Sequence, residues 1–193
     1  MIRKNLSLPD LAAVICDACK RNGIDIVLSG GACVSIYTEN EYESFDLDFV
    51  LLSHVRRKMI SPVLEALGFR EDGRHYRHPD TPYIVEFLSP PLSVGGEPVR
   101  EIHEIRRGKM ILRLLSPTDC VKDRLAAFYH WNDKPSLDQA LLVCKDIPVD
   151  LREVRRWSMN EGMKDKFKLF KEALSESGSK KSKRRNYFDG RVY

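Results

Sequence analysis

Apolar side chains recur at helical spacing near the start of the chain, from Leu8 to Cys19, until Asn22-Gly23 interrupts them. Ser7 stands directly before this stripe, and serine is a preferred helix-capping residue, so the spacing predicts a helix that begins near Ser7. A short β-branched run over 24–28 follows and ends in glycines. Such a run is typical of a strand that leads into a tight turn.

The same two spacings alternate as far as residue 115. Runs of alternating β-branched and aromatic residues predict strands, and apolar stripes at every third or fourth position predict helices. Glycine-containing segments between them predict turns, including a hairpin around 71–73. We expect helices over 32–37 and 56–67 and strands over 44–52, 83–88, 101–106 and 110–115.

From residue 116 onward the pattern is helical. Ser116 is suited to cap a helix, Pro117 to its first position and Asp119 to its first turn, so a helix is expected from there to about Trp131. Further amphipathic stripes predict helices over 136–145, 150–160 and 164–174. The sequence thus predicts an α/β core over 1–115, a helical part over 116–174 and a flexible tail over 175–193.

The composition is that of a globular protein. Charged residues make up 31% and hydrophobic residues 42% of the 193 positions. No apolar run approaches the roughly 20 residues of a membrane-spanning helix, and the first residues do not have the pattern of a signal peptide. We therefore expect a cytoplasmic protein with no membrane partner.

The five cysteines are odd in number and lie mostly within apolar helical patterns, which disfavours a disulfide framework. Cys16 and Cys19 form a Cys-x-x-Cys motif, but no second pair of ligands lies near it in the sequence. Core packing is therefore the favoured interpretation over zinc or redox chemistry.

The formal net charge of +4 is modest, but the basic residues gather near the C-terminus. A Ser/Gly-rich stretch over 175–179 precedes this cluster. Such a tail binds a phosphate backbone in some proteins and only adds solubility in others, and both interpretations stay open. The cluster consists of Lys180, Lys181, Lys183, Arg184 and Arg185.

The strand expected over 44–52 contains the acidic pair Asp46 and Asp48. Alternate side chains of a strand share a face, so these carboxylates project together while Phe45 and Leu47 face the other way. Two neighbouring carboxylates repel each other unless a cation, a proton or solvent relieves them. The motif therefore predicts a site for a divalent metal.

Two further features extend this candidate site. Ser29, Gly30 and Gly31 follow a predicted strand and precede a predicted helix, a geometry in which free backbone N–H groups favour phosphate. Glu86 interrupts the apolar face of the strand over 83–88. If that strand lies beside the Asp46 strand, the three carboxylates converge and supply the oxygen ligands that Mg²⁺ or Mn²⁺ prefers.

At these residues the sequence resembles the nucleotidyltransferase superfamily that includes DNA polymerase beta. The match consists of Leu28-Ser29-Gly30-Gly31 and, after a long spacer, the acid-apolar-acid strand at Asp46-Leu47-Asp48. The resemblance implies a mixed sheet flanked by helices, with metal ions on Asp46, Asp48 and Glu86. It also implies transfer of a nucleoside monophosphate from an NTP such as ATP to an acceptor hydroxyl.

Among the branches of that superfamily, the chain looks most like small bacterial enzymes related to AbiEii-type toxins of toxin–antitoxin and phage-defence systems. In that group one later helix supplies a lysine to the nucleotide phosphates and another supplies an acid, and the matching residues here are Lys122 and Asp138. The resemblance implies an acceptor such as tRNA or another RNA, a protein or a small molecule. A cognate antitoxin or toxin protein and a homodimer are the further partners it suggests.

Alternatives stay open at each of these residues. Glu86 could pair with Arg100 or Arg113 within the sheet, Lys122 could be a solvated helix flank, and Asp138 could be a first-turn acid favoured by the helix dipole. Histidines at 75 and 78 precede a Pro-Asp turn and are interpreted as loop residues and not as a zinc site. The rival functions are a non-catalytic binding module that retains the fold and a metal-dependent nuclease.

Overall fold

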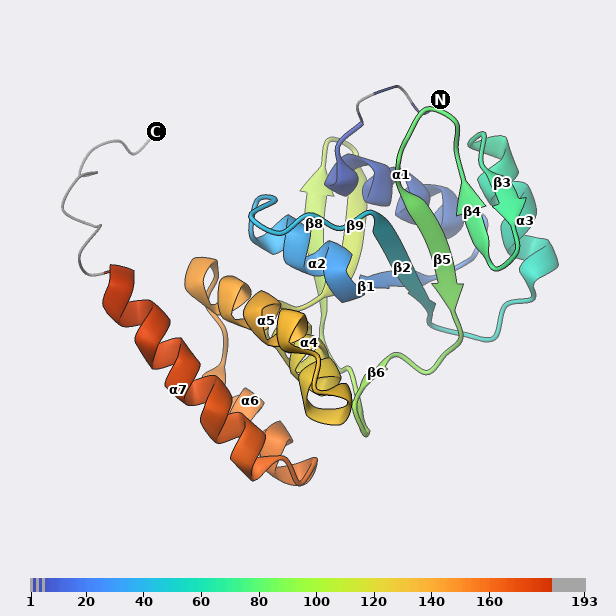
Figure 1. The fold of residues 1–193 in the computed structure, drawn as a ribbon. Helices are drawn as coiled ribbons and strands as arrows, with labels where there is room; N and C mark the ends of the chain where they lie inside the picture. The colour runs from blue at the N-terminus through green and yellow to red at the C-terminus, as the bar shows by residue number, and fades with distance from the viewer. Residues whose placement is uncertain (1, 3, 5, 182–193) are drawn as a thin grey trace.

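A computed structural model describes residues 2, 4 and 6–181 of the chain. A seven-stranded mixed sheet has the order β3–β4–β5–β2–β1–β9–β8 (Figure 1). A short hairpin, β6–β7, lies apart from it and was not predicted from the sequence. The strands are β1 (Ile26–Ser29), β2 (Asp46–Leu51), β3 (Arg70–Asp72), β4 (His75–Arg77), β5 (Ile84–Leu88), β6 (Ser93–Val94), β7 (Glu97–Pro98), β8 (Ile102–Arg107) and β9 (Met110–Leu115).

The pairing of the central strands aligns polar residues across the sheet. β1 and β2 are antiparallel, with Ser29 opposite Asp48, and β2 and β5 are parallel, with Asp48 opposite Glu86. β4 is antiparallel to β5, with His75 opposite Glu86. Directly paired residues share a face of a sheet, so the four side chains Ser29, Asp48, Glu86 and His75 form one row.

Helices α1 (Leu8–Arg21), α2 (Gly30–Tyr37) and α3 (Arg57–Ala66) belong to the sheet part of the chain. The backbone N–H of Asp10 donates to the side chain of Ser7, which confirms the predicted helix start. α1 packs on β1 and β9, α3 packs on α1, and α2 packs on β1 and β2. In Figure 1 α2 lies on the near side of the sheet and α1 on the far side.

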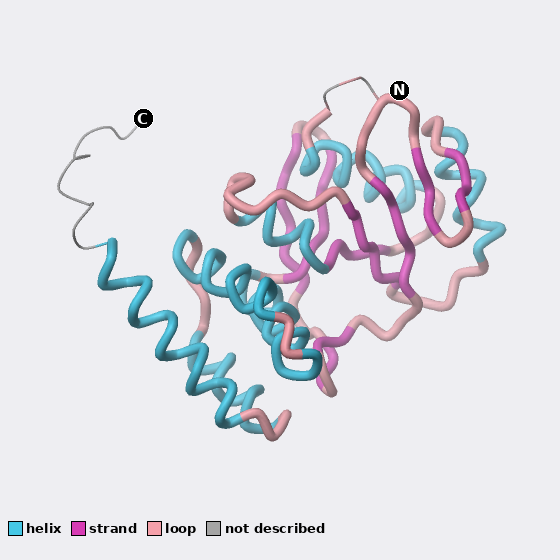
Figure 2. Tube along the Cα trace, viewed as in Figure 1, coloured by secondary structure: helices cyan, strands magenta, loops and turns pink. Residues whose placement is uncertain are grey.

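The helical part gathers to one side of the sheet (Figure 2). It consists of α4 (Pro117–Trp131), α5 (Lys134–Asp146), α6 (Leu151–Asn160) and α7 (Lys164–Lys181). Ser116 caps α4 as predicted by accepting the N–H of Asp119 at 3.1 Å. α7 extends to Lys181 and so is longer than the predicted helix over 164–174. The predicted tail residues Lys183, Arg184 and Arg185 lie outside the described residues.

The core runs without interruption from the sheet into the helices. Trp157 of α6 and Phe170 of α7 are fully buried, as are Leu28 and Phe49 of the sheet. All five cysteines are free thiols and four of them are buried, which confirms that they pack in the core. None of the helices in the described residues has both the length and the hydrophobicity of a transmembrane span.

Tyr37, at the last position of α2, ties this helix to the sheet. Its buried hydroxyl donates to the carbonyl of Leu115 at 2.6 Å. Tyr37→Phe leaves that carbonyl without its partner, so we expect the free energy of unfolding to fall by about 1–3 kcal/mol in urea titrations. Tyr42→Phe is the matched control, because no hydrogen bond of its hydroxyl is found among the described residues. An equal loss in both variants would contradict this role.

Candidate active site

The aspartates of β2 lie on the face that the sequence predicts. Asp46 is exposed and Asp48 is half-buried, whereas Leu47 and Phe49 between and beyond them are fully buried on the opposite face. The apolar residues anchor the strand in the core. The strand therefore presents both carboxylates on its other face without any distortion of the backbone.

The glycine turn lies directly against Asp48. The hydroxyl of Ser29 donates to the backbone carbonyl of Asp48 at 3.1 Å. Gly30, the first residue of α2, has φ +69°, and a Cβ at this position would lie 2.8 Å from Oδ2 of Asp48. A side chain here would clash with the carboxylate, so glycine both permits the turn and lets the helix begin beside Asp48. The amino end of α2 and Asp48 thus form one site.

Asp48 has a raised proton affinity. Its pKa is raised to about 6, chiefly by burial and then by the neighbouring carboxylates Glu86 and Asp46, while Arg124 acts in the opposite direction. A cation bound next to such a partly buried carboxylate stabilises its ionised form. This is the electrostatic condition that a metal-binding aspartate meets.

Glu86 lies next to Asp48, as expected from the sequence for adjacent strands, but it has its own partners. Its carboxylate is 3.3 Å from Nε of Arg74 and 3.2 Å from Nε2 of His75. The alternative partner Arg113 instead binds Asp25 at 2.9 Å. The interpretation of residue 75 as a loop residue is wrong, because His75 belongs to β4 and faces Glu86.

The two aspartates of β2 are suited to bind a divalent metal. Within the described residues, no three His, Cys, Asp or Glu side chains are grouped closely enough to form a metal site by themselves. Asp46 and Asp48 offer adjacent carboxylate oxygens, the ligand type that Mg²⁺ and Mn²⁺ prefer. Glu86 is shared with Arg74 and His75, and its role as a third ligand stays a prediction.

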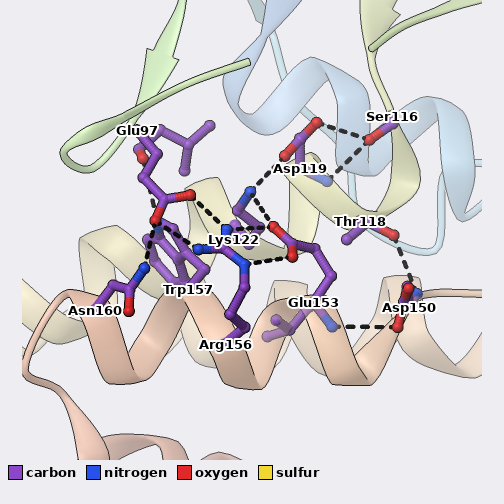
Figure 3. Close-up of polar contacts among 12 residues, drawn as sticks. Glu97, Ser116, Thr118, Asp119, Lys122, Asp150, Glu153, Arg156, Trp157 and Asn160 are labelled. Atoms are coloured by element: carbon purple, nitrogen blue, oxygen red, sulfur yellow. Dashed lines mark hydrogen bonds and ion pairs between the residues drawn. The ribbon is translucent and has the colours of Figure 1, made fainter. Parts of the chain in front are cut away.

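Lys122 points toward Asp119 of its own helix and Glu153 of α6 (Figure 3). Its ammonium lies 2.8 Å from Oδ1 of Asp119 and 3.4 Å from Oε1 of Glu153, and its side chain is only 7% exposed. Arg156 extends this network to Glu97 of β7, and hydrogen bonds from Arg156 and then Asn160 lower the pKa of Glu97 to about 2. These side chains line a cavity of about 400 Å³ whose lining includes neither Asp46 nor Asp48.

Arg124 is the cation that the structure adds to the site. It lowers the pKa of Asp48, and its Nε donates to Asp123 at 2.9 Å. Two residues along a helix are about 200° apart, so α4 directs Arg124 and Lys122 to different sides. The sequence analysis overlooked Arg124 because the resemblance pointed to the lysine, although the helical spacing already separates the two.

Asp138 is exposed on α5, whereas the next residue, Gln139, is buried and its Oε1 accepts from Arg124 at 3.4 Å. The side of α5 that meets α4 therefore presents the amide of Gln139. The role predicted for Asp138 stays a prediction.

Comparison with known proteins supports the fold. No protein-family model matches this chain, and no curated protein matches it. Among solved structures, an antigenic nucleotidyltransferase-like protein from Paracoccidioides brasiliensis is similar, with TM-score 0.56, 14% identity, and 74% of this chain and 78% of that chain covered. The fold is nucleotidyltransferase-like.

A second similar structure is the antibiotic-resistance factor ANT(2'')-Ia, in solution, with TM-score 0.46 and 13% identity over 92% of this chain and 96% of that chain. The same factor in complex with adenylyl-2"-tobramycin has TM-score 0.46 and 12% identity over 84% of this chain and 96% of that chain. At these identities the likeness concerns the nucleotidyltransferase-like fold, and the first structure is the one that supports it.

Removing the charge of Asp48 is expected to stabilise the metal-free protein at neutral pH. The folded chain raises this pKa from 3.8 to about 6, so it holds the proton more tightly than the unfolded chain does. Stability therefore falls as the pH rises from about 4 to about 6, and the penalty is complete above that range. Asp48→Asn should raise the free energy of unfolding by about 1–3 kcal/mol near neutral pH.

The measurement is urea unfolding of both proteins with a chelator present, near neutral pH and again at about pH 4, where the difference should nearly vanish. Asp46→Asn is the control, since this side chain is exposed and less of its charge is desolvated. A gain of equal size at both pH values would show that the charge of Asp48 is not its cause.

Proposed function

We propose that this protein is a metal-dependent nucleotidyltransferase that moves a nucleoside monophosphate from an NTP to an acceptor hydroxyl. The observation that carries the proposal is the row formed by Ser29, Asp48 and Glu86, with the amino end of α2 beside Asp48. The amino end of a helix stabilises bound phosphate, and paired carboxylates bind the divalent metal that accompanies an NTP. Both requirements are met within one short stretch of the sheet.

The phosphates would lie at Ser29, Gly30 and Gly31. The backbone N–H groups of the first turn of α2 have no partners within the helix and would donate to phosphate oxygens. Arg124 acts on Asp48 from α4 and would neutralise phosphate charge on the same side. In this proposal Arg124 neutralises the phosphate charge, the role that the resemblance implies for Lys122.

In the transfer step the oxygen of the acceptor hydroxyl attacks the α-phosphorus of the NTP. A new P–O bond forms, the bond from the α-phosphorus to the bridging oxygen of the β-phosphate breaks, and pyrophosphate leaves. Glu86 would take the proton of the hydroxyl, because it adjoins Asp48 on the side away from the glycine turn. His75 and Arg74 would hold its carboxylate in place.

Asp46 and Asp48 would hold Mg²⁺ or Mn²⁺, which supplies charge neutralisation at the phosphates and activation of the attacking oxygen when bound. The biological context of the proposal rests on the resemblance alone. It is a cytoplasmic toxin–antitoxin or phage-defence system in which the protein has a cognate protein partner and forms a homodimer.

Transfer should depend on both aspartates. We expect Asp46→Asn Asp48→Asn to lower transfer by at least about 100-fold, because the metal contributes several kcal/mol to such reactions. The assay incubates the protein with each labelled NTP, Mg²⁺ or Mn²⁺ and an extract of RNA and protein. Asp165→Asn Glu172→Gln on α7, which removes the same charge from exposed positions, is the control. Undiminished labelling by the double aspartate variant would refute the mechanism.

Substitutions of the two cations of α4, Arg124 and Lys122, should have different effects. Arg124→Gln is expected to raise the KM for NTP by about tenfold, the effect of one lost charged contact of roughly 1.4 kcal/mol. Lys122→Met is expected to lower the free energy of unfolding by about 3 kcal/mol, because Asp119 and Glu153 lose a buried partner. Initial rates and urea titrations of both variants separate the roles. Lost NTP affinity with unchanged stability in Lys122→Met would return the phosphate role to Lys122.

The rival interpretation is a non-catalytic module in which the acids serve only as structural ion pairs. The ion pair of Glu86 with Arg74, together with its contact to His75, is the observation that favours it. It predicts no metal-dependent affinity for any NTP. Equilibrium dialysis with labelled NTP, with and without Mg²⁺, therefore decides between the two before an acceptor is known.

A further inference from the structure

Strand β8 forms one edge of the seven-stranded sheet. It pairs with β9 along its whole length, from Ile102 opposite Leu115 to Arg107 opposite Met110, and within the described residues no strand pairs with its other side. In Figure 1 it lies at the left margin of the sheet, at the other end from β5. An edge of this kind presents backbone N–H and C=O groups that another strand can bind.

The outward backbone groups of β8 belong to every second residue. The turn between β8 and β9 consists of residues 108 and 109, and Gly108 has φ +61°. A two-residue hairpin turn is closed by a hydrogen-bonded pair, here Arg107 and Met110, and such pairs alternate along an antiparallel ladder. Residues 103, 105 and 107 therefore bond to β9. The residues that direct their N–H and C=O groups outward are Ile102, Glu104 and Arg106.

β8 lacks the features by which edge strands commonly avoid association. Its register with β9 is continuous over all 6 residues, so it contains no bulge, and it contains no proline. It does carry charges, but Glu104 and Arg106 have opposite signs. Charges of one sign repel a second copy in every register, whereas charges of both signs repel it only in some registers.

Ion pairing within one copy does not account for the charges at this edge. Glu101, Arg106 and Lys109 are exposed, and no hydrogen bond or ion pair of their side chains is found among the described residues. Glu104 lies 3.6 Å from Nε of Arg113, but its side chain is 55% exposed. A carboxylate has room for more than one donor, so Glu104 can also bind a cation that approaches from outside.

The charges select one register for two antiparallel copies of β8. Outward residues must face outward residues, so the copies can shift only in steps that keep this match. With Ile105 on the twofold axis, Glu104 of each copy lies opposite Arg106 of the other. An axis at residue 104 places Glu104 opposite Glu104, and an axis at residue 106 places Arg106 opposite Arg106. Like charges directly opposite each other are destabilising, so the axis at Ile105 is favoured.

The same register suits the residues at the ends and beside the strand. Glu101 of one copy comes opposite Lys109 of the other, and Ile105 comes opposite its own copy. Ile111 of β9, which pairs with Arg106, is 41% exposed and adds apolar surface next to the edge. Charge, apolar contact and backbone direction therefore agree on one arrangement.

We propose that β8 pairs with β8 of a second copy of this chain, antiparallel about Ile105, so that the two sheets become one continuous sheet. Strand addition at a sheet edge supplies backbone hydrogen bonds, and a twofold axis makes each contact occur twice. β9 separates β8 from β1, β2 and β5, which carry the candidate active site. The proposal gives a surface to the homodimer named in the proposed function, and the transfer reaction does not depend on it.

The test measures the dissociation constant of the dimer by analytical ultracentrifugation over a range of protein concentrations. Arg106→Glu turns both Glu104–Arg106 pairs into pairs of like charge, so we expect the Kd to rise by about tenfold or more. Glu104→Arg should have the same effect. Arg70→Glu reverses the same charge on β3, the opposite edge strand, and should leave the Kd unchanged.

Mixing the two single variants is the decisive experiment. A Glu104→Arg copy paired with an Arg106→Glu copy again has opposite charges at both positions, so the Kd of the mixture should return toward that of the unchanged protein. Urea titration checks that each variant is folded, because Glu104→Arg also loses the contact with Arg113. Arg106→Glu loses no such contact and tests the interface even if the other variant is unstable.

Amide hydrogen exchange reports the strand pairing directly. With rising protein concentration the N–H groups of Glu104 and Arg106 should become protected, whereas that of Ile105, which already bonds to β9, should not change. This pattern distinguishes pairing of β8 from a dimer formed by side chains alone.

A protein that stays monomeric up to about 1 mM would overturn the proposal. So would a dimer that is as sensitive to Arg70→Glu as to Arg106→Glu, or a mixture of folded single variants that does not recover. Failure of the proposed transfer reaction is recognised separately, by absent NTP binding in the unchanged protein.

Discussion

The half-buried charge of Asp48 is the constraint around which the site is organised. Burial and two neighbouring carboxylates raise the pKa of Asp48 to about 6. The carboxylate of Asp48 lies beside Gly30, directly after the end of β1. The space it occupies exists because glycine has no Cβ. Cations around it, whether side chains or metal ions, gain free energy from that charge. The glycine turn and Glu86 adjoin this carboxylate, and Arg124 of α4 acts on it electrostatically.

Helix α4 separates two electrostatic environments that the sequence places two residues apart. One side carries Arg124 toward Asp48, and the other carries Lys122 into a network with Asp119 and Glu153. The second network joins α4 to α6 and, through Arg156, to the β6–β7 hairpin. It joins the helical part to the hairpin, so the position of α4, and with it that of Arg124, depends in part on these ion pairs. The ammonium of Lys122 lies within ion-pair distance of both carboxylates, and its side chain is only 7% exposed.

The two flanks of Asp48 differ in the kind of positive charge they offer. On the α2 side it comes from backbone N–H groups and one mostly buried arginine, which suits a compact triphosphate. On the side of the β3–β4 hairpin it comes from exposed arginines, of which Arg77 pairs with Asp72 and Arg74 with Glu86. Glu86 lies at the boundary and is held from the hairpin side by Arg74 and His75.

The sequence by itself determined the local elements and the chemical type of the site. Ser7 and Ser116 cap their helices, and Asp46 and Asp48 share a face, because capping and alternation depend only on near neighbours along the chain. Only the tertiary structure decided which strands pair, and hence that Glu86 adjoins Asp48 and meets His75. It also decided that Arg124, and not Lys122, acts on Asp48, since the rotation of α4 about its axis is set by packing against α2, α5 and α6. Strand register and helix rotation join residues far apart in the chain, and no local pattern encodes them.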